Sequence, residues 1–420
     1  MELALQDGRA QRRLTRNKRQ RASRVASDIL TLNAGSSSLK FSLWQAETGM
    51  ELRELFRGEI EKIGIAPHLS AREPGGRTVI DNDFAEGGAK LSHEDLLREL
   101  FVWLSQQRRN GIKAIGHRIV HGGATFTAPV RIDDHVMENL SKLEPLAPLH
   151  QPHNLSGIRI CAALQPRVPQ IACFDTAFHR TMDSVARRLG LPRVYEEEGV
   201  QRYGFHGLSY EFIAQQLRAI DPDLAKGRVI VAHLGNGASL CAMRDGRSVD
   251  TTMSFTALDG LLMGTRPGAL DPGAVTYLMR ERTMSAAEIE DLLYHRSGLL
   301  GISGISSDMR TLLASDDSHA REAVELFVFR AAREIGALIA SLGGLDGLVF
   351  TAGIGEHASE IRSRVCARCA WLGIVIDEPA NRTGQMRITS EASSVRVYIV
   401  PTDEEKMIAE HTVKTLAELL

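Results

Sequence analysis

The stretch LNAGSSSLKFSL at residues 32–43 decides how this chain is interpreted, because a run of Gly and Ser separates two apolar segments. The pattern predicts two strands joined by a small polar turn, with Lys40 just inside the second strand. A turn with almost no side chains lets an anionic group approach backbone N–H groups and hydroxyls closely. Because turns are rich in these residue types anyway, an ordinary tight turn is the alternative for one such hairpin taken alone.

A second hairpin of the same kind is predicted at VIVAHLGNGASLCAM (229–243). After a shift of 201 residues, Ile29-Leu30 falls on Ile230-Val231 and Ser38-Leu39 falls on Ser239-Leu240. A repeat at this spacing predicts two related α/β domains, each opening with a hairpin that faces a shared cleft. Chance similarity of two short hairpins is the alternative.

Length and composition narrow the class of protein. The 420 residues, 43% of them hydrophobic, are enough for two or three domains with full cores. A formal net charge of −2 argues against a general nucleic-acid binder. No run of 18 apolar residues occurs, so we expect no membrane-spanning helix.

The cysteines indicate a reducing compartment. Five cysteines are an odd number in a large chain, which suits the cytoplasm. Cys366 and Cys369 form a CxxC pair, but no second pair follows that would complete a zinc site. We therefore interpret them as two helical cysteines three residues apart.

The first 24 residues differ from the rest of the chain. They hold eight Lys or Arg against Glu2 and Asp7, without the apolar segment of a secretory signal. An Arg-rich targeting peptide is one interpretation, but the composition favours a disordered extension or an upstream start codon. Residues 1–27 are therefore left out of the expected fold.

Strand and helix signals alternate from Asp28 onward. Ser92-His-Glu-Asp95 predicts a capping box that starts an apolar-periodic helix, and Asn110-Gly111 ends it. Further strands are predicted within 114–123, 171–175, 345–357 and 395–413, the last followed by a break at Pro401 and a closing helix. No GxxxxGK[ST] occurs, so a P-loop is not expected to hold any nucleotide.

Eight motifs in order resemble those of the acetate kinase family, in the acetate/butyrate kinase branch of the actin–sugar kinase–Hsp70 superfamily. They are NAGSSSLKF (33–41), GHRIVHGG (116–123), FDTAFH (174–179), YGFHGLS (203–209), HLGNGAS (233–239), MGTRPGALDPG (263–273), TAGIGE (351–356) and PTDEE (401–405). The resemblance covers almost everything from residue 28 to 420. It implies an α/β fold of two duplicated RNase H-like domains, the actin-like ATPase or acetokinase fold, around a central nucleotide cleft. The expected domains are 28–176 plus 403–420, with the carboxylate site, and 177–402, with the nucleotide site.

The activity implied by this resemblance is reversible phosphoryl transfer from ATP to acetate, giving acetyl phosphate and ADP by direct in-line transfer. Both reacting groups are anionic, so the reaction needs cationic positioning groups and a metal. Guanidinium groups bind carboxylate and phosphate oxygens in pairs. By resemblance, Arg118 holds the carboxylate, while Arg266 and His206 stabilise the oxygens of the phosphoryl group in transfer.

The carboxylates receive distinct roles. The family is often assigned an acid/base at Asp175, but a small carboxylic acid has a pKa of about 4 to 5 and is already ionised near pH 7. We expect Asp175 to orient metal-bound water and the arginines instead. The resemblance assigns Mg²⁺, with Mn²⁺ as a substitute, to Asn33 and Glu404. Thr402-Asp-Glu-Glu405 matches a capping box, so Glu405 is expected to fold back on the helix start and leave Glu404 available for the metal.

The remaining site residues also follow from the resemblance. The carboxylate side is expected to include Val120, His150, Phe205 and Ala257. The ATP side is expected to include Lys40, His233, Leu234, Gly235, Asn236, Gly237, Asp308, Met309, Arg310, Gly353, Ile354, Gly355, Glu356 and His357. For His150 and His179 two interpretations stay open: each side chain makes a contact in the cleft, or each is a structural histidine.

Departures from the family pattern leave the acyl-chain preference open. Ala257 stands where relatives usually have proline, Pro267 and Ala269 are unusual beside Arg266, and His357 replaces a common asparagine. A propionate or butyrate kinase is therefore an alternative function. An alternative from a different class of protein is an actin- or Hsp70-like ATPase that is coupled to a partner. The expected partners are a small carboxylate, ATP or ADP, and a second copy in a homodimer, with neither nucleic acid nor membrane.

Overall fold

The computed structural model describes residues 27–35, 37–47, 51–84, 91–108 and 111–418. The basic extension lies outside the described residues except for Ser27. The chain divides into two compact units: unit 1 comprises residues 1–120, 128–173 and 405–420, and unit 2 comprises 121–127 and 174–404. The boundaries expected from the sequence differ from this division at residues 121–127, 174–176 and 403–404. Within the described ranges, no helix has the length and apolar character needed to cross a membrane.

Unit 1 is built on an eight-stranded sheet with the order β5-β4-β3-β2-β1-β6-β8-β7. The strands are β1 (Ser27–Ala34), β2 (Leu39–Ala46), β3 (Leu52–Glu61), β4 (His68–Arg72), β5 (Thr78–Asp83), β6 (Ile112–Ile119), β7 (Val130–Arg131) and β8 (Gln170–Phe174). Strands β1 and β2 form the predicted antiparallel hairpin, in which Asn33 pairs with Lys40. Strand β6 pairs with β1 in parallel, as far as the pair Leu32 and His117.

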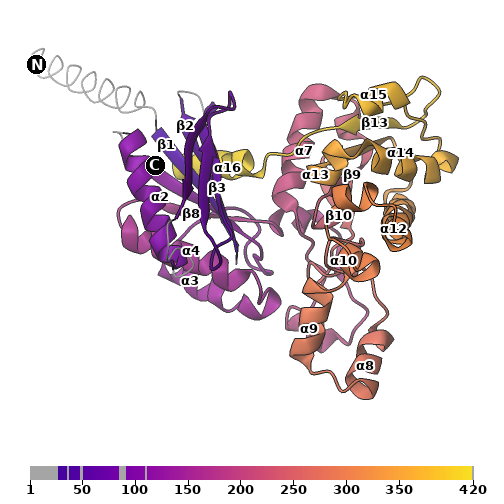
Figure 1. The fold of residues 1–420 in the computed structure, drawn as a ribbon, viewed down its shortest axis with the longest axis horizontal. Coiled ribbons are helices and arrows are strands. Elements are labelled where there is room, and N and C mark those ends of the chain that lie inside the picture. Colours follow the sequence, from indigo (N-terminus) through magenta and orange to yellow (C-terminus); the bar gives the residue numbers. More distant parts are fainter. Residues whose placement is uncertain (1–26, 36, 48–50, 85–90, 109–110, 419–420) are drawn as a thin grey trace, which may run out of the picture. The chain divides into compact units, whose positions relative to one another are not determined.

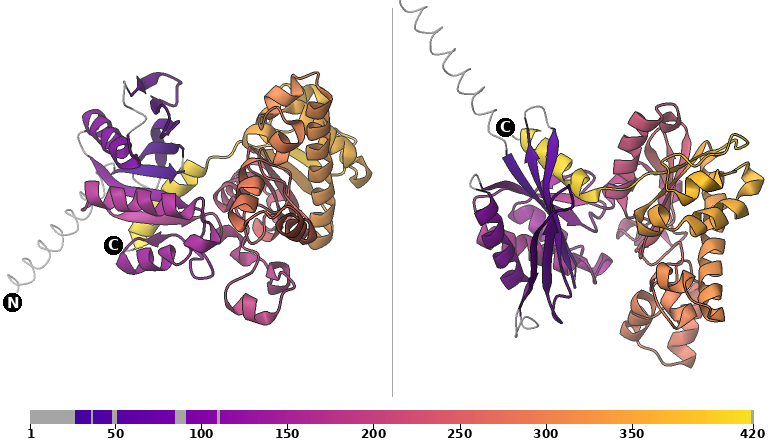
Figure 2. Two further views of the ribbon diagram at one scale, coloured as in Figure 1. Left: turned by 60° about the horizontal axis from the view of Figure 1, so that its bottom comes forward. Right: turned by 45° about the horizontal axis from the view of Figure 1, so that its top comes forward.

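Helices cover both faces of this sheet (Figures 1 and 2). They are α2 (His93–Gln107), α3 (Asp134–Ser141), η2 (Glu144–Leu146), α4 (Gln151–Leu164) and α16 (Glu404–Glu418). Alternate strand residues face opposite sides: Leu30 packs with α2, whereas Ile29 packs with Ala409 of α16. Helix α16 approaches β6 so closely that a Cβ on Gly116 would lie 2.2 Å from Thr412 Oγ1. Only glycine fits there.

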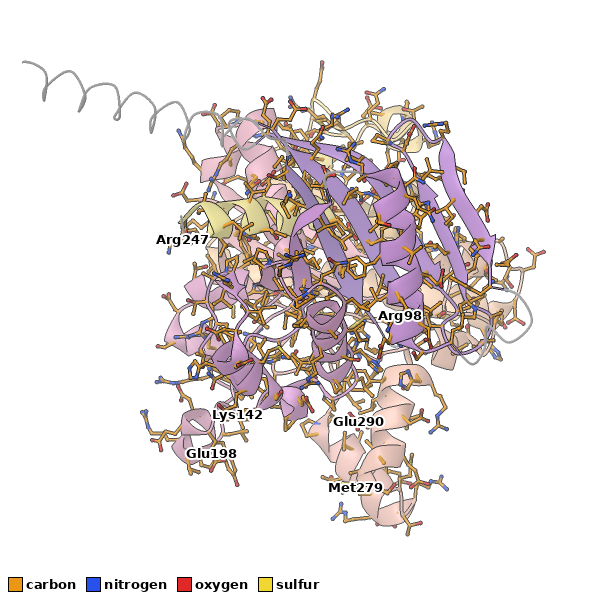
Figure 3. All side chains as sticks on the ribbon, turned by 90° about the vertical axis from the view of Figure 1, so that its left-hand side faces the viewer. Arg98, Lys142, Glu198, Arg247, Met279 and Glu290 are labelled. Atoms are coloured by element: carbon orange, nitrogen blue, oxygen red, sulfur yellow. The ribbon has the colours of Figure 1, made fainter. Side chains whose placement is uncertain are left out.

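The predicted start of α2 is confirmed. The Ser92 hydroxyl accepts from the Asp95 N–H, and the Asp95 carboxylate accepts from the Ser92 N–H, which is a capping box. Leu96, Leu97 and Leu100 are buried on the inner face of the helix. Arg98, on its outer face, is exposed, as is Lys142 after α3 (Figure 3).

Unit 2 repeats the strand arrangement of unit 1 in a smaller sheet with the order β11-β10-β9-β12-β13. The strands are β9 (Arg228–Leu234), β10 (Ala238–Arg244), β11 (Arg247–Thr251), β12 (Gly347–Thr351) and β13 (Arg396–Ile399). As in unit 1, the first strand pairs with an antiparallel hairpin partner on one side and a parallel strand on the other. The predicted α/β fold with a duplicated arrangement is therefore confirmed.

Helices also lie on both faces of the second sheet, with α7 and α12 on opposite sides (Figure 1). They are η3 (Ala177–Thr181), α5 (Ser184–Arg187), α6 (Arg193–Glu197), α7 (Gly207–Ile220), η4 (Leu224–Lys226), α8 (Pro272–Glu281), α9 (Ala286–His295), α10 (Gly298–Ser303), α11 (Met309–Leu313), α12 (Ser318–Leu342), α13 (Ala352–His357), α14 (Ser359–Arg368), η5 (Ala370–Leu372) and α15 (Glu378–Arg382). Cys366 lies on α14 as predicted, whereas Cys369 follows the helix as its C-cap residue; both are buried free thiols.

The predicted capping box at residues 402–405 is wrong. Helix α16 begins at Glu404, and the Thr402 N–H donates to Glu356 Oε1 at 3.2 Å. The Thr402 hydroxyl donates to Ser209 Oγ at 2.9 Å, and Glu405 forms an ion pair with Arg57 at 3.5 Å. In a capping box the Thr402 N–H would pair with the Glu405 carboxylate, but here each of these groups binds a partner far away in the sequence.

Candidate active site

In unit 2, the turn between β9 and β10 brings two predicted catalytic side chains together. The Gly235 N–H donates to the Gly237 carbonyl oxygen at 3.1 Å, which closes the turn. A Cβ on Gly237 would lie 2.6 Å from Arg266 Nη2 and 3.4 Å from His206 Nε2. The bare backbone of the turn therefore makes room for a guanidinium and an imidazole directly against it.

His206 is held in one orientation. Its backbone is left-handed, with φ at 58°, where it caps the start of α7. Nδ1 lies 2.8 Å from Ser239 Oγ, and the ring stacks on His233 with centroids 4.1 Å apart. His233 Nδ1 lies in turn 2.8 Å from Ser209 Oγ. These contacts direct the Nε2 edge of His206 toward Gly237.

The Arg266 loop is equally constrained. Arg266 Nη1 donates to the Ala257 carbonyl oxygen at 2.8 Å, and the Met263 N–H donates to the Arg266 carbonyl oxygen at 3.0 Å. Gly298, with φ at 66°, packs so closely that a Cβ there would lie 2.7 Å from the Arg266 nitrogen. Both the backbone and the guanidinium of Arg266 are therefore fixed.

Asp175 lies beside the start of α7. It follows β8, is 1% exposed, and its carbonyl oxygen accepts from the Gly207 N–H at 2.9 Å. A Cβ on Gly207 would lie 2.1 Å from that oxygen, so the FHG motif needs glycine here. The next residue, Thr176, accepts from the Gly122 N–H at 3.0 Å, which joins the GHRIVHGG and FDTAFH motifs.

The structure gives His179 a structural role. Nδ1 lies 2.8 Å from Ser248 Oγ and Nε2 lies 2.8 Å from the Phe205 carbonyl oxygen, so both ring nitrogens have protein partners. Burial lowers its pKa to about 4, and the neutral ring supports the backbone of the buried Phe205. His121, which sequence reasoning did not single out although GHRIVHGG contains it, packs edge-on against Tyr203 and Phe205.

A pocket of about 570 Å³ in unit 2 collects most of the residues predicted to contact ATP. Its lining comprises Gly235, Asn236, Ser307, Asp308, Met309, Arg310, Leu313, Gly353, Ile354, His357 and Ala358. This volume lies in the usual range for small-ligand sites. Gly235 and Asn236 line the pocket, and Gly237 lies against Arg266 and His206. The same turn therefore borders both the pocket and these two side chains.

Six residues predicted to contact ATP lie outside this lining, among them Gly237, which packs against Arg266, and Lys40 of unit 1. Leu234 and Gly355 are buried in the protein, and His233 stacks under His206. Glu356 Oε1 accepts from the N–H groups of Ala352, at 2.8 Å, and Thr402. The structure thus gives the Glu356 carboxylate backbone partners that hold the pocket wall.

Arg362 supports the pocket from behind, and no sequence motif indicated it. The side chain is 1% exposed, and Nη1 donates to the carbonyl oxygens of Gly355 and Glu356, both at 2.9 Å. Nε donates to Asn381 Oδ1 at 2.7 Å. Burial lowers the pKa of the Arg362 guanidinium. These bonds fix helix α13, which carries the GIGEH residues, relative to α14 and α15.

Unit 1 holds four of the residues predicted for the carboxylate and metal, namely Asn33, Arg118, Val120 and His150. Arg118 Nη1 donates to Asn33 Oδ1 at 3.2 Å, and Asn33 pairs across the hairpin with the exposed Lys40. Val120 is buried just after β6, and His150 caps the start of α4. Three charged or polar predicted site residues therefore gather at the ends of β1, β2 and β6.

The donor chemistry of Asn33 and Glu404 fits Mg²⁺. An amide oxygen and a carboxylate are hard oxygen donors, and Mg²⁺ commonly takes only one or two carboxylates beside phosphates and water. In the part of the chain that the structure describes, no group of three or more His, Cys, Asp or Glu side chains could form a metal site of its own. By donor type alone, Asn33 and Glu404 each suit Mg²⁺ whose remaining positions are filled by phosphate oxygens and water.

Fold and site together define an α/β phosphotransferase built from two units of matching strand order. Residues 28–410 match the acetokinase family, to which the chain belongs. It is 55% identical to acetate kinase of Rhodopseudomonas palustris (strain ATCC BAA-98 / CGA009), over 91% of this chain and 97% of that protein. Among solved structures, a propionate kinase from Francisella tularensis is 38% identical with a TM-score of 0.86, covering 92% of this chain and 99% of that one. Porphyromonas gingivalis acetate kinase is also 38% identical, with a TM-score of 0.82 and coverage of 93% and 100%.

Proposed function

We propose that this protein transfers a phosphoryl group reversibly between ATP and acetate, giving acetyl phosphate and ADP. The observation that carries the proposal is the shared turn at 235–237. Its first two residues line a pocket suited to a nucleoside, and its third packs against Arg266 and His206. A nucleotide in the pocket would therefore place its phosphates at a bare backbone turn flanked by two groups that can stabilise negative charge.

The residues of this chain then divide the work of an in-line transfer. Arg266 and His206 stabilise charge on the phosphoryl oxygens, and because their orientations are fixed beforehand, little reorganisation is needed during the reaction. Arg118 binds the acceptor carboxylate through its guanidinium fork. The carboxylate is already ionised near pH 7, so no general base is required, and Asp175 orients the surrounding groups. Mg²⁺, or Mn²⁺ in its place, would neutralise phosphate charge when held by Asn33 and Glu404.

Propionate is a second acceptor that one observation favours. Ala257, whose carbonyl oxygen anchors Arg266, presents a smaller side chain than the proline usual at this position. The similarity to a solved propionate kinase agrees with such a use. The proposal also includes a cytoplasmic location and a homodimeric state. Size-exclusion chromatography with light scattering would test the homodimer.

Trapping the product with hydroxylamine tests the activity. Enzyme, ATP, Mg²⁺ and acetate should yield acetyl hydroxamate, and omission of any one should abolish it. Arg266→Ala serves as the control for a contaminating kinase. ATP hydrolysis without hydroxamate would contradict the proposal and favour a partner-coupled ATPase.

A further inference from the structure

Asn154, on helix α4, uses both ends of its side-chain amide to bridge two strands of unit 1. The side chain is 3% exposed. Its Oδ1 accepts from the Val120 N–H at 3.0 Å, and its Nδ2 donates to the Ala34 carbonyl oxygen at 2.7 Å. A buried amide with both functions bonded avoids the cost of unsatisfied polar groups and holds its partners at a set separation.

The bridge lies where the sheet no longer holds these strands together. The parallel pairing between β1 and β6 extends only to Leu32 and His117. The following residues on each strand are Asn33 and Arg118, which are joined through their side chains at 3.2 Å. Beyond the last ladder pair, the Asn154 amide replaces the missing backbone hydrogen bonds between the strand ends.

The packing of α4 explains how a side chain as short as asparagine can reach both strands. Gly157, one turn further along the helix, lies so close to β1 that a Cβ there would be 3.3 Å from the Ala34 Cβ. The Asn154 N–H also donates to the carbonyl oxygen of His150, at 3.1 Å. Asn154 is thus tied to the strand ends that carry Asn33, Arg118 and Val120, and to His150 on its own helix.

We propose that Asn154 is a positioning residue that sets the separation of Asn33 from Arg118, and so couples the metal side of the site to the carboxylate side. The inference rests on the proposed function, which assigns those two sides. A shift of about 1 Å in a positioned group can cost roughly a hundredfold in rate. Loss of the bridge should therefore affect carboxylate use and metal use together.

The test uses Asn154→Asp and Asn154→Ala in the full-length protein. Aspartate keeps the acceptor for the Val120 N–H but loses the donor for the Ala34 carbonyl oxygen. Both variants should raise the KM for acetate about tenfold or more and raise the Mg²⁺ concentration for half-maximal rate several-fold. If the alanine variant fails to fold, the near-isosteric aspartate variant carries the test.

Gln170→Ala provides a matched control for the loss of a buried amide. Gln170 is buried in the same unit, and its Oε1 lies 2.7 Å from His117 Nε2. The Gln170→Ala substitution should lower Tm about as much as the Asn154 substitutions do, and should leave the KM for acetate within about twofold of wild type. Equal rises in this KM for the Gln170 and Asn154 variants, or unchanged kinetics in the latter, would show a merely structural role.

A double-mutant cycle separates positioning from general damage. If Asn154 acts through Arg118, adding Asn154→Ala to an Arg118→Ala enzyme should change kcat/KM for acetate far less than it does in wild type. Fully additive effects would overturn the inference. Failure of the proposed function would be seen separately, as a wild-type enzyme that forms no acetyl hydroxamate.

Discussion

Arg266 is anchored by the backbone of Ala257, with Nη1 donating to the carbonyl oxygen at 2.8 Å while Nη2 lies against Gly237. A main-chain carbonyl orients the guanidinium without adding a neutralising negative charge. The Arg266 guanidinium therefore contacts two segments outside its own loop, namely the turn at 235–237 and the loop at 257. In unit 2, this cation is the best-defined candidate for stabilising a phosphoryl group.

Replacing Arg266 should reduce catalysis strongly while leaving the fold intact. We expect Arg266→Ala to lower kcat about 10²- to 10³-fold, the usual cost of removing one charge-stabilising donor. Arg266→Lys should recover only part of the rate, because an ammonium lacks the planar fork that reaches Ala257 and Gly237 together. Steady-state kinetics and Tm measure both effects.

Arg330→Ala is the control for this prediction. Arg330 also donates to a carbonyl oxygen of the same loop, that of Ala269 at 3.3 Å, and the expected activity of the variant is close to wild type. A wild-type kcat in Arg266→Ala would remove Arg266 from the site.

Local signals in the sequence predicted much of this architecture. The hairpins, the capping box at Ser92 and the strand before Asp175 all depend on neighbours within a few residues, so the sequence displays them directly. The motifs also predicted that Arg266, His206 and the turn at 235–237 act together.

Partners far apart in the sequence escaped prediction. Asn154 reaches Ala34 across 120 residues, and Thr402 reaches Ser209 across 193. A polar side chain has several possible partners, and the choice depends on which helices pack against which strands. The capping box at Thr402 failed for this reason, since tertiary hydrogen bonds displaced a local one.

The two adjacent acids at the start of α16 should differ in their effect on metal use. Glu405 forms an ion pair with Arg57, whereas Glu404 is the proposed metal ligand. Glu404→Gln should therefore raise the Mg²⁺ concentration for half-maximal rate by at least tenfold, and Glu405→Gln should change it less than twofold. A titration of Mg²⁺ at fixed ATP decides between them. The opposite ranking would exchange the roles of the two residues.

Stability should fall in mild acid because burial favours the neutral forms of His117, His121 and His179. Burial lowers the pKa values of His117, His121 and His179 to about 4 each. The unfolded chain, with histidine pKa values near 6.5, binds more protons than the folded chain between these limits. Stability contributed by the neutral forms is therefore present above about pH 6.5 and is lost as the pH falls toward 4.

Urea unfolding at pH 7.5 and 5.0 measures this loss. We expect roughly 1–2 kcal/mol per buried histidine between these pH values. His179→Gln should reduce the loss of unfolding free energy between the two pH values by roughly the contribution of one buried histidine. Equal stability at the two pH values in wild type would contradict the prediction.

Ala257 should influence which acyl chain the enzyme accepts. Alanine leaves more space than proline and a less rigid loop, and one extra methylene buried there is worth about 0.8 kcal/mol. We expect wild type to use propionate within about tenfold of acetate in kcat/KM, and Ala257→Pro to widen that gap. Because proline retains the carbonyl oxygen that anchors Arg266, kcat for acetate should stay near the wild-type value and serves as the internal control. Kinetics with both acids in both enzymes give the comparison. An acetate-to-propionate ratio that is the same in the two enzymes would mean that residue 257 acts only through its backbone, as the anchor of Arg266, and does not set chain length.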